Sequence, residues 1–393
     1  NRMTNVRAGK LFGTANGALI NYVEATVLSL LLVFVLKDGK ELTWGYITAV
    51  PWWVYLGSIC GLLAQLLQII GTLHSNTLVS SVLMLVGNLG MSLTLDYVFY
   101  GTFSLLRAAG ILLILLGIPK WKRGQMELTM LDVGQGDGLV LRTPEGNCFL
   151  VDGGSTNKSG VGQYQILPYL KNQGISQIDG IFISHTDQDH ISGVQEILEM
   201  AVKKLNSVKL GCLYLPEWEN PPAAWEKLKQ TAKEAGIPVR TLKEGDCLNA
   251  GKLQLQIIAP AVSASGADVN EDGMVIKVKY EEFLGLLTGD IGEETEKKLL
   301  ELGVLEDVDF LKVGHHGSHY STCQQFLDTV RPEYAVISCS STNTYGHPSP
   351  EITKRLEEAE CQTSFTMESG AVKVCWEKER IRIKKFLEKG NGL

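Results

Sequence analysis

Four long apolar runs occupy most of the chain before residue 120. They cover residues 18–36, 44–70, 77–95 and 98–118, and a helix of roughly 20 such residues crosses the hydrocarbon core of a bilayer. The pattern therefore predicts three or four membrane-spanning helices. Two charges inside the runs, Glu24 and Arg107, are costly in lipid, so we expect both to face protein or a water-filled path. The alternative is a very apolar helical domain outside the membrane.

After residue 126 the pattern changes to short apolar segments separated by turn residues and by helical periodicity. Strands are predicted at residues 128–133, 138–141, 147–151, 178–184, 209–215, 253–258, 274–280, 283–288, 310–313, 334–338 and 371–376. Helices are predicted at residues 164–172, 223–235, 293–302, 323–330 and 349–359, with one more between the strand at 178–184 and residue 204. Two strand-rich blocks, each with helices, predict an α/β fold of two sheets back to back with helices outside.

Charge divides the chain at the same place. Residues 1–125 carry 9 Lys and Arg against 4 Asp and Glu, a net of +5, whereas residues 126–393 carry 27 against 39, a net of −12. We therefore expect a membrane segment at 1–125, a strand-rich domain at 126–377 and a basic C-terminal tail at 378–393. Because the chain begins with Asn1 rather than Met, we also expect that an earlier part is missing.

The eight cysteines include no C-x-x-C pair. A zinc–thiolate site is therefore not expected, and the cysteines are best explained as small apolar residues.

The densest group of potential metal ligands follows the predicted strand at 178–184. His185, Asp187 and Asp189 alternate along an extended segment and so project to one side, and the turn into the next helix brings His190 back beside them. Four such residues within six positions indicate a site that two cations could share. The alternative is a solvated polar loop.

Other histidines and acids lie at the ends of predicted strands or the starts of helices. They are Asp152, Asp290, His315, His316, His319 and His347. If the strands are neighbours, these groups converge on one edge of the sandwich, where ligand sites are common.

Four segments together resemble the ordered motifs of the metallo-β-lactamase superfamily: VDGG at 151–154, HTDQDH at 185–190, TGD at 288–290 and VGHHGS at 313–318. LDVGQGD at 131–137 and YGHP at 345–348 narrow the resemblance to the ComEC family, the membrane channel proteins of bacterial DNA uptake. The resemblance covers about residues 126–377. It implies an αββα sandwich behind a multi-span helical membrane segment.

The resemblance implies a role for each matching residue. His185 and Asp187 would bind one metal, Asp189, His190 and His315 the other, and Asp290 both. His316 would be either an alternative ligand or a substrate contact, and Asp152 would orient ligands through hydrogen bonds. The expected catalytic residues are Asp189, Asp290, His316 and His347; Asp137, Ser318, Ser321 and His347 would line the mouth, with Ser318 and Ser321 suited to a phosphate.

The chain departs from the superfamily pattern in one informative way. Asp187 stands where a second histidine is usual, and no histidine lies between His190 and His315, where Asn270 is the nearest candidate ligand. Oxygen ligands in place of imidazole favour harder cations. We therefore expect two divalent metal ions, with manganese favoured over zinc.

The resemblance implies a multi-pass bacterial membrane protein whose domain hydrolyses the DNA strand that is not imported, with DNA, membrane lipid and other DNA-uptake components as partners. Two alternatives are a phosphoesterase for another phosphodiester and an inactive module that only grips DNA. The side of the membrane on which the domain lies is undecided. Lys120, Lys122 and Arg123 favour the cytoplasm, whereas the family's role implies the outer face.

Overall fold

The computed structural model describes residues 77–101, 103–117, 125–377 and 379–387, together with Val23, Val27, Leu28, Leu63 and Ala64. The predicted runs at 18–36 and 44–70, with Glu24, lie outside the described residues apart from these five positions. The chain divides into two units near residue 120, and each is described by itself.

The first unit contains helices α5 (Thr77–Tyr100) and α6 (Leu105–Gly117). The helical prediction for both runs is confirmed, but their boundary moves: α5 continues to Tyr100, and the positive φ of Gly101 (64°) follows it. Arg107 of α6 forms an ion pair with Asp96 of α5. This carboxylate supplies a partner for the charge that the sequence analysis expected to face protein or a water-filled path. Among the described residues, no helix has both the length and the apolar character needed to cross a membrane.

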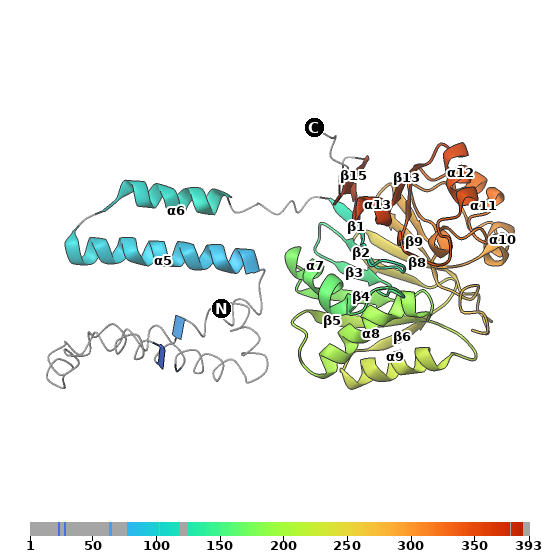
Figure 1. The fold of residues 1–393 in the computed structure, drawn as a ribbon, viewed down its shortest axis with the longest axis horizontal. Helices are drawn as coiled ribbons and strands as arrows, with labels where there is room; N and C mark the ends of the chain where they lie inside the picture. Colours follow the sequence, from blue (N-terminus) through green and yellow to red (C-terminus); the bar gives the residue numbers. More distant parts are fainter. Residues whose placement is uncertain are drawn as a thin grey trace. The chain divides into compact units, whose positions relative to one another are not determined.

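The second unit is built on two sheets (Figure 1). In order across the first sheet lie β15 (Ile381–Lys385), β14 (Val372–Trp376), β1 (Met126–Met130), β2 (Leu139–Arg142), β3 (Cys148–Val151), β4 (Gln177–Phe182), β5 (Lys209–Pro216) and β6 (Val239–Leu242). Across the second lie β13 (Gln362–Phe365), β12 (Tyr334–Ile337), β11 (Phe310–Lys312), β10 (Phe283–Leu287), β9 (Val275–Tyr280), β8 (Leu253–Ala259) and β7 (Cys247–Ala250).

Helices cover the outer faces of both sheets. On the first sheet these are η2 (Gly162–Ile166), α7 (Leu167–Asn172), α8 (Gln188–Val202) and α9 (Ala223–Glu234). On the second they are α10 (Glu293–Glu301), α11 (Gln324–Val330) and α12 (Pro350–Glu358), and the short η3 (Gly314–Gly317) and α13 (Thr366–Ser369) complete the unit.

Alternation along the strands explains this layering. Phe182 and Phe283 are fully buried between the two sheets, whereas Ile181 faces the other way and packs with Ile197 of α8. Leu311 likewise lies on the helix side of the second sheet. Strands that are buried on both faces need helices on the outside of each sheet. This part of the chain forms the αββα sandwich that the sequence analysis expected.

Four strands were missed by the sequence analysis, namely β6, β7, β13 and β15. The last contradicts the expected basic tail, because Ile381–Lys385 pairs with β14 as an antiparallel edge strand. Ile381 and Ile383 alternate with Arg382 and Lys384, and the two isoleucines pack against the inter-sheet core. The basic side chains therefore mark the solvent side of a strand.

Candidate metal centre

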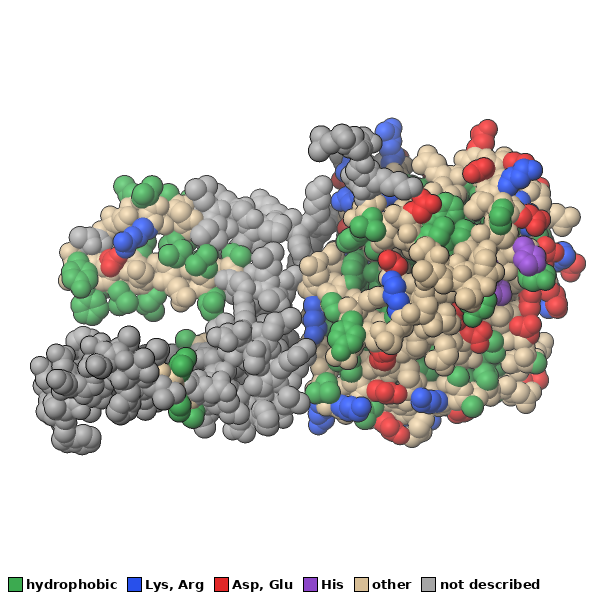
Figure 2. All heavy atoms as spheres, viewed as in Figure 1, with side chains coloured by type: hydrophobic (Ala, Val, Ile, Leu, Met, Phe, Trp, Pro, Cys, Tyr) green, Lys and Arg blue, Asp and Glu red, His purple; other side chains and the backbone are tan. Residues whose placement is uncertain are grey.

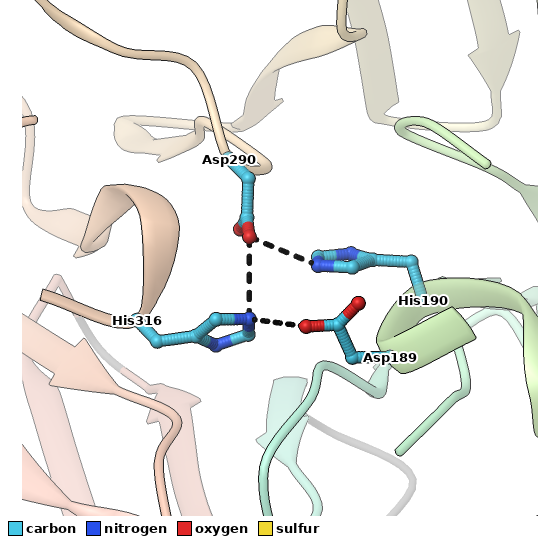
Figure 3. A group of neighbouring side chains, drawn as sticks. All are labelled: Asp189, His190, Asp290 and His316. Atoms are coloured by element: carbon cyan, nitrogen blue, oxygen red, sulfur yellow. Dashed lines mark hydrogen bonds and ion pairs between the residues drawn. The ribbon is translucent and has the colours of Figure 1, made fainter. Parts of the chain in front are cut away.

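The ligand cluster forms where the two sheets meet at the C-terminal ends of their strands. Asp189 and His190 begin α8 after β4, Asp290 follows β10, and His316 lies in η3 after β11 (Figure 3). His316 Nε2 lies 3.2 Å from Asp189 Oδ2 and 3.2 Å from Asp290 Oδ2. His190 Nε2 is also 3.2 Å from Asp290 Oδ2. Each of the four residues offers a ligand atom within 4.8 Å of the others, which suits one divalent cation.

An unsatisfied nitrogen atom beside this group also indicates a metal site. Nε2 of His185 is buried and has no hydrogen-bond partner, whereas Nε2 of His190 faces Asp290 Oδ2. A buried polar atom without a partner costs about 1–3 kcal/mol. A cation bound by the lone pair of His185 would remove that cost, so the residues present fit the divalent metals that the sequence analysis expected.

Hydrogen bonds fix the orientation of both cluster imidazoles. Nδ1 of His190 lies 3.0 Å from Asp152 Oδ2, and Nδ1 of His316 lies 2.9 Å from the carbonyl oxygen of Ser338. Asp152 also accepts from Ser184, through the backbone N–H and the hydroxyl, at 2.7 Å each. Because Nδ1 is engaged, Nε2 of each ring is turned toward the cluster. The contact geometry of Asp152 is the one that an orienting role requires.

Lys312, which the sequence analysis did not single out, is buried against the cluster. Its ammonium donates to the carbonyl oxygen of Gly289 at 2.7 Å and to Asp290 Oδ1 at 3.2 Å, and it pairs with Asp137. These three acceptors use all three donors of an ammonium group. Asp137 therefore forms an ion pair beneath the cluster, whereas it was expected at the mouth. The sequence offered one signal for Lys312: it is a lysine at the end of an apolar strand, directly before the VGHHGS motif.

The electrostatics of the cluster favour charged imidazoles while no cation is bound. Burial opposes protonation of His190, but the carboxylates of Asp290 and Asp152 outweigh it and raise its pKa well above the usual value. The same balance, led by Asp290 and Asp137, raises the pKa of His316 to about 10. A metal ion must therefore displace protons from both rings when it binds.

His185 and Asp187 lie together after β4, and the loop that carries Asn270 reaches the same strand end. Burial and the neighbouring positive charge of His190 lower the pKa of His185 to about 3, so its imidazole is neutral. Its Nε2 lies 3.7 Å from Asp187 Oδ2. Asn270 Oδ1 is another buried atom without a partner, and its loop is tied to this strand end by a 2.7 Å hydrogen bond from Met274 N to Ser184 O. These residues offer one nitrogen and two oxygen ligands.

His315 and His316 point in different directions. Both have a positive φ, 48° and 53°, and only His316 enters the group of four. The ring of His315 lies 5.8 Å from that of His347. Of the two, His316 is therefore the one that belongs to the group that could hold a metal ion, which is the alternative that the sequence analysis left open.

The residues expected at the mouth divide into two kinds. Ser321 is fully buried, and its hydroxyl donates to the carbonyl oxygens of Gly314 at 2.9 Å and Ser318 at 3.0 Å. It therefore stabilises the η3 loop and does not face a substrate. Ser318 is also buried. His347 is half-buried beside His316, and burial together with His316 and His315 lowers its pKa to about 4, so its ring is neutral.

Comparisons with known proteins agree with this architecture. The family model described as the metallo-beta-lactamase superfamily matches residues 131–341. Residues 1–119 match a second model, YdcZ, described as a proposed inner membrane exporter.

Curated relatives match about two thirds of the chain. The chain is 30% identical over 259 residues to ComE operon protein 3 of Bacillus subtilis, which covers 63% of this chain and 32% of that protein. It is 31% identical over 270 residues to Recombination protein 2 of Haemophilus influenzae, covering 68% and 30%. The chain thus spans about a third of the length of these relatives. Among solved structures it is similar to the metallo-beta-lactamase fold protein YhfI from Bacillus subtilis, at 13% identity and a TM-score of 0.41 over 61% of this chain and 96% of that one.

Proposed function

This chain belongs to the metallo-beta-lactamase superfamily, and we propose that its second unit is a metal-dependent phosphodiesterase that cleaves DNA within a membrane-bound DNA-uptake protein. The observation that carries the proposal is the buried group of Asp189, His190, Asp290 and His316. The curated relatives confirm the resemblance to the ComEC family. Because that family takes part in DNA uptake, the resemblance supports DNA as the substrate. The match of residues 1–119 supports a membrane location.

We propose two ligand sets. Asp189, His190, Asp290 and His316 would hold one cation, and His185, Asp187 and Asn270 would hold the other. Asp290 directs Oδ2 toward both imidazoles while Oδ1 stays with Lys312, so a bridging role would use Oδ2. Divalent cations held there would supply a water of lowered pKa and positive charge for the phosphate oxygens.

Two residues, one of them the ligand Asp187, lie on the substrate side. Asp187 is half-exposed and is the carboxylate of the group that substrate can approach. His347 is neutral at physiological pH, so one ring nitrogen can donate a hydrogen bond to a phosphate or leaving oxygen. With the carboxylate of Asp187 and the amide oxygen of Asn270 as proposed ligands beside a single imidazole, manganese is favoured over zinc at that set.

A second candidate is a phosphodiesterase for a smaller substrate. The net charge of −12 over residues 126–393 favours it, because nucleic-acid binding relies on Lys and Arg. On the face shown in Figure 2, acidic and basic side chains are interspersed over the second unit.

The test measures metal content and hydrolysis on the purified chain. We expect bound manganese or zinc, and faster cleavage of labelled single- or double-stranded DNA than of bis(p-nitrophenyl) phosphate. Asp290→Asn should abolish hydrolysis and reduce metal content, while the exposed Asp307→Asn serves as the matched control. Asparagine is used because its amide oxygen can still accept from Lys312, whereas alanine would remove one of the three acceptors of that ammonium.

Each contrary outcome selects another function. Hydrolysis of the small ester without cleavage of DNA would favour the second candidate. A chain that binds no metal would instead support a module that only grips DNA.

A further inference from the structure

Three aromatic rings form a row from the surface to the metal centre. The ring of Tyr345 lies 5.7 Å from that of His347 at 26°, and the ring of His347 lies 6.4 Å from that of His316 at 28°. These distances and angles are those of offset-stacked aromatic pairs. The inner ring belongs to the ligand group, and the outer ring, that of Tyr345, is 62% exposed.

The two outer rings lie in the loop of residues 340–347, and the side chain of Asn343 holds this loop. Asn343 Nδ2 donates to the carbonyl oxygens of Ser340 at 2.5 Å and His347 at 2.6 Å. Its Oδ1 accepts from the backbone N–H groups of Tyr345 at 3.1 Å and His347 at 3.0 Å. Four hydrogen bonds from one amide fix the loop in the conformation that stacks the rings.

The base of the loop is also anchored to the opposite half of the sandwich. Ser340 N donates to Gln135 Oε1 at 3.2 Å, and Asn157 Nδ2 donates to Ser340 Oγ at 2.8 Å. Both partners lie in segments that follow strands of the first sheet. The position of Tyr345 is therefore set in advance, and a ligand that stacks on it has little ordering cost to overcome.

We infer that Tyr345, continued by His347, is a stacking subsite for the nucleobase that adjoins the scissile phosphate. The inference rests on the proposed function, since it needs a nucleotide phosphate at the neighbouring cluster. Every base has a flat face, so stacking on an aromatic ring is sequence-tolerant. It also requires no basic side chain, which matters in a domain with a net charge of −12. Stacking thus supplies affinity that this acidic surface lacks.

The test compares two oligonucleotides that differ only in their bases. One is a short single-stranded oligothymidylate, and the other is the same backbone built of abasic residues. Their binding to the purified chain is measured by fluorescence anisotropy with a metal chelator, so that no turnover occurs. Their hydrolysis is then measured with manganese. The variants are Tyr345→Leu, Tyr345→Phe and the control Tyr164→Leu, which removes a tyrosine of similar exposure (68%) on η2.

We expect the wild-type chain to prefer the base-bearing oligonucleotide in both assays. Tyr345→Leu should reduce that preference about 10-fold, which corresponds to about 1.4 kcal/mol. Tyr345→Phe should retain it, because stacking needs the ring and not the hydroxyl, and Tyr164→Leu should also retain it.

Equal preference in wild type and Tyr345→Leu would overturn the subsite. Failure of the proposed function looks different: neither oligonucleotide is hydrolysed by the wild type. The binding preference then decides the subsite independently, since a wild type that binds both oligonucleotides equally overturns it as well.

Discussion

Replacing Lys312 by methionine removes the only side-chain cation, apart from histidine, among the contacts described for the cluster carboxylates. Methionine is unbranched and of similar length, so it fills the space without the charge. Asp137 and Asp290, whose side chains are 4% and 3% exposed, each lose an ion pair, and Gly289 loses a hydrogen bond. Breaking a buried pair in this way costs about 3–5 kcal/mol, because the remaining carboxylate is left uncompensated.

The loss should depend on metal. Without metal, a destabilisation of this size lowers the midpoint of thermal unfolding by roughly 6–20 °C in a domain of about 250 residues. A divalent cation bound at Asp290 restores positive charge beside the same carboxylates. We therefore expect metal to raise the midpoint of Lys312→Met more than that of the wild type.

The assay is calorimetric unfolding of both proteins with chelator and with saturating manganese. Lys298→Met is the matched control, because its ion pair with Glu294 is exposed and should contribute less than about 1 kcal/mol. If Lys312→Met unfolds like this control, or loses the same amount with and without metal, then the ammonium is not what balances the cluster.

Three further predictions concern the ligands. His316→Ala should lower the bound metal measured by mass spectrometry more than His315→Ala does, and the reverse order would restore the ligand role to His315. Asn270→His adds an imidazole and should move the preference in a metal competition from manganese toward zinc; an unchanged ranking would place Asn270 outside the metal set. The pKa of His316 rises from 6.5 to about 10 on folding, so its stabilisation of the metal-free protein is complete below pH 6.5 and is lost as the pH rises through about 10. Urea unfolding with chelator should show this decline, and His316→Gln should flatten it.

Local sequence was sufficient for features that depend on neighbouring residues. The alternation of apolar positions predicted most strands of the sandwich, and the six residues from His185 to His190 marked the strand end where the ligands gather. Asp152 was expected to orient ligands, and it lies in hydrogen-bonding contact with Ser184 and His190. The short polar edge strands β6 and β7 were missed because few of their side chains are buried, so they carry little apolar signal.

Which side chain of an adjacent pair reaches the cluster was decided only by the tertiary structure. His315 and His316 have the same chemistry, and the choice depends on a left-handed backbone turn and on the carbonyl of Ser338 that receives Nδ1 of His316. Lys312 meets Asp137 because β11 of one sheet ends beside the loop that precedes β2 of the other. The sequence by itself determined which residue types and strand ends were available. The packing of two sheets determined which of them meet, because a charge buried between sheets is stable only beside a partner that folding brings from a distant part of the chain.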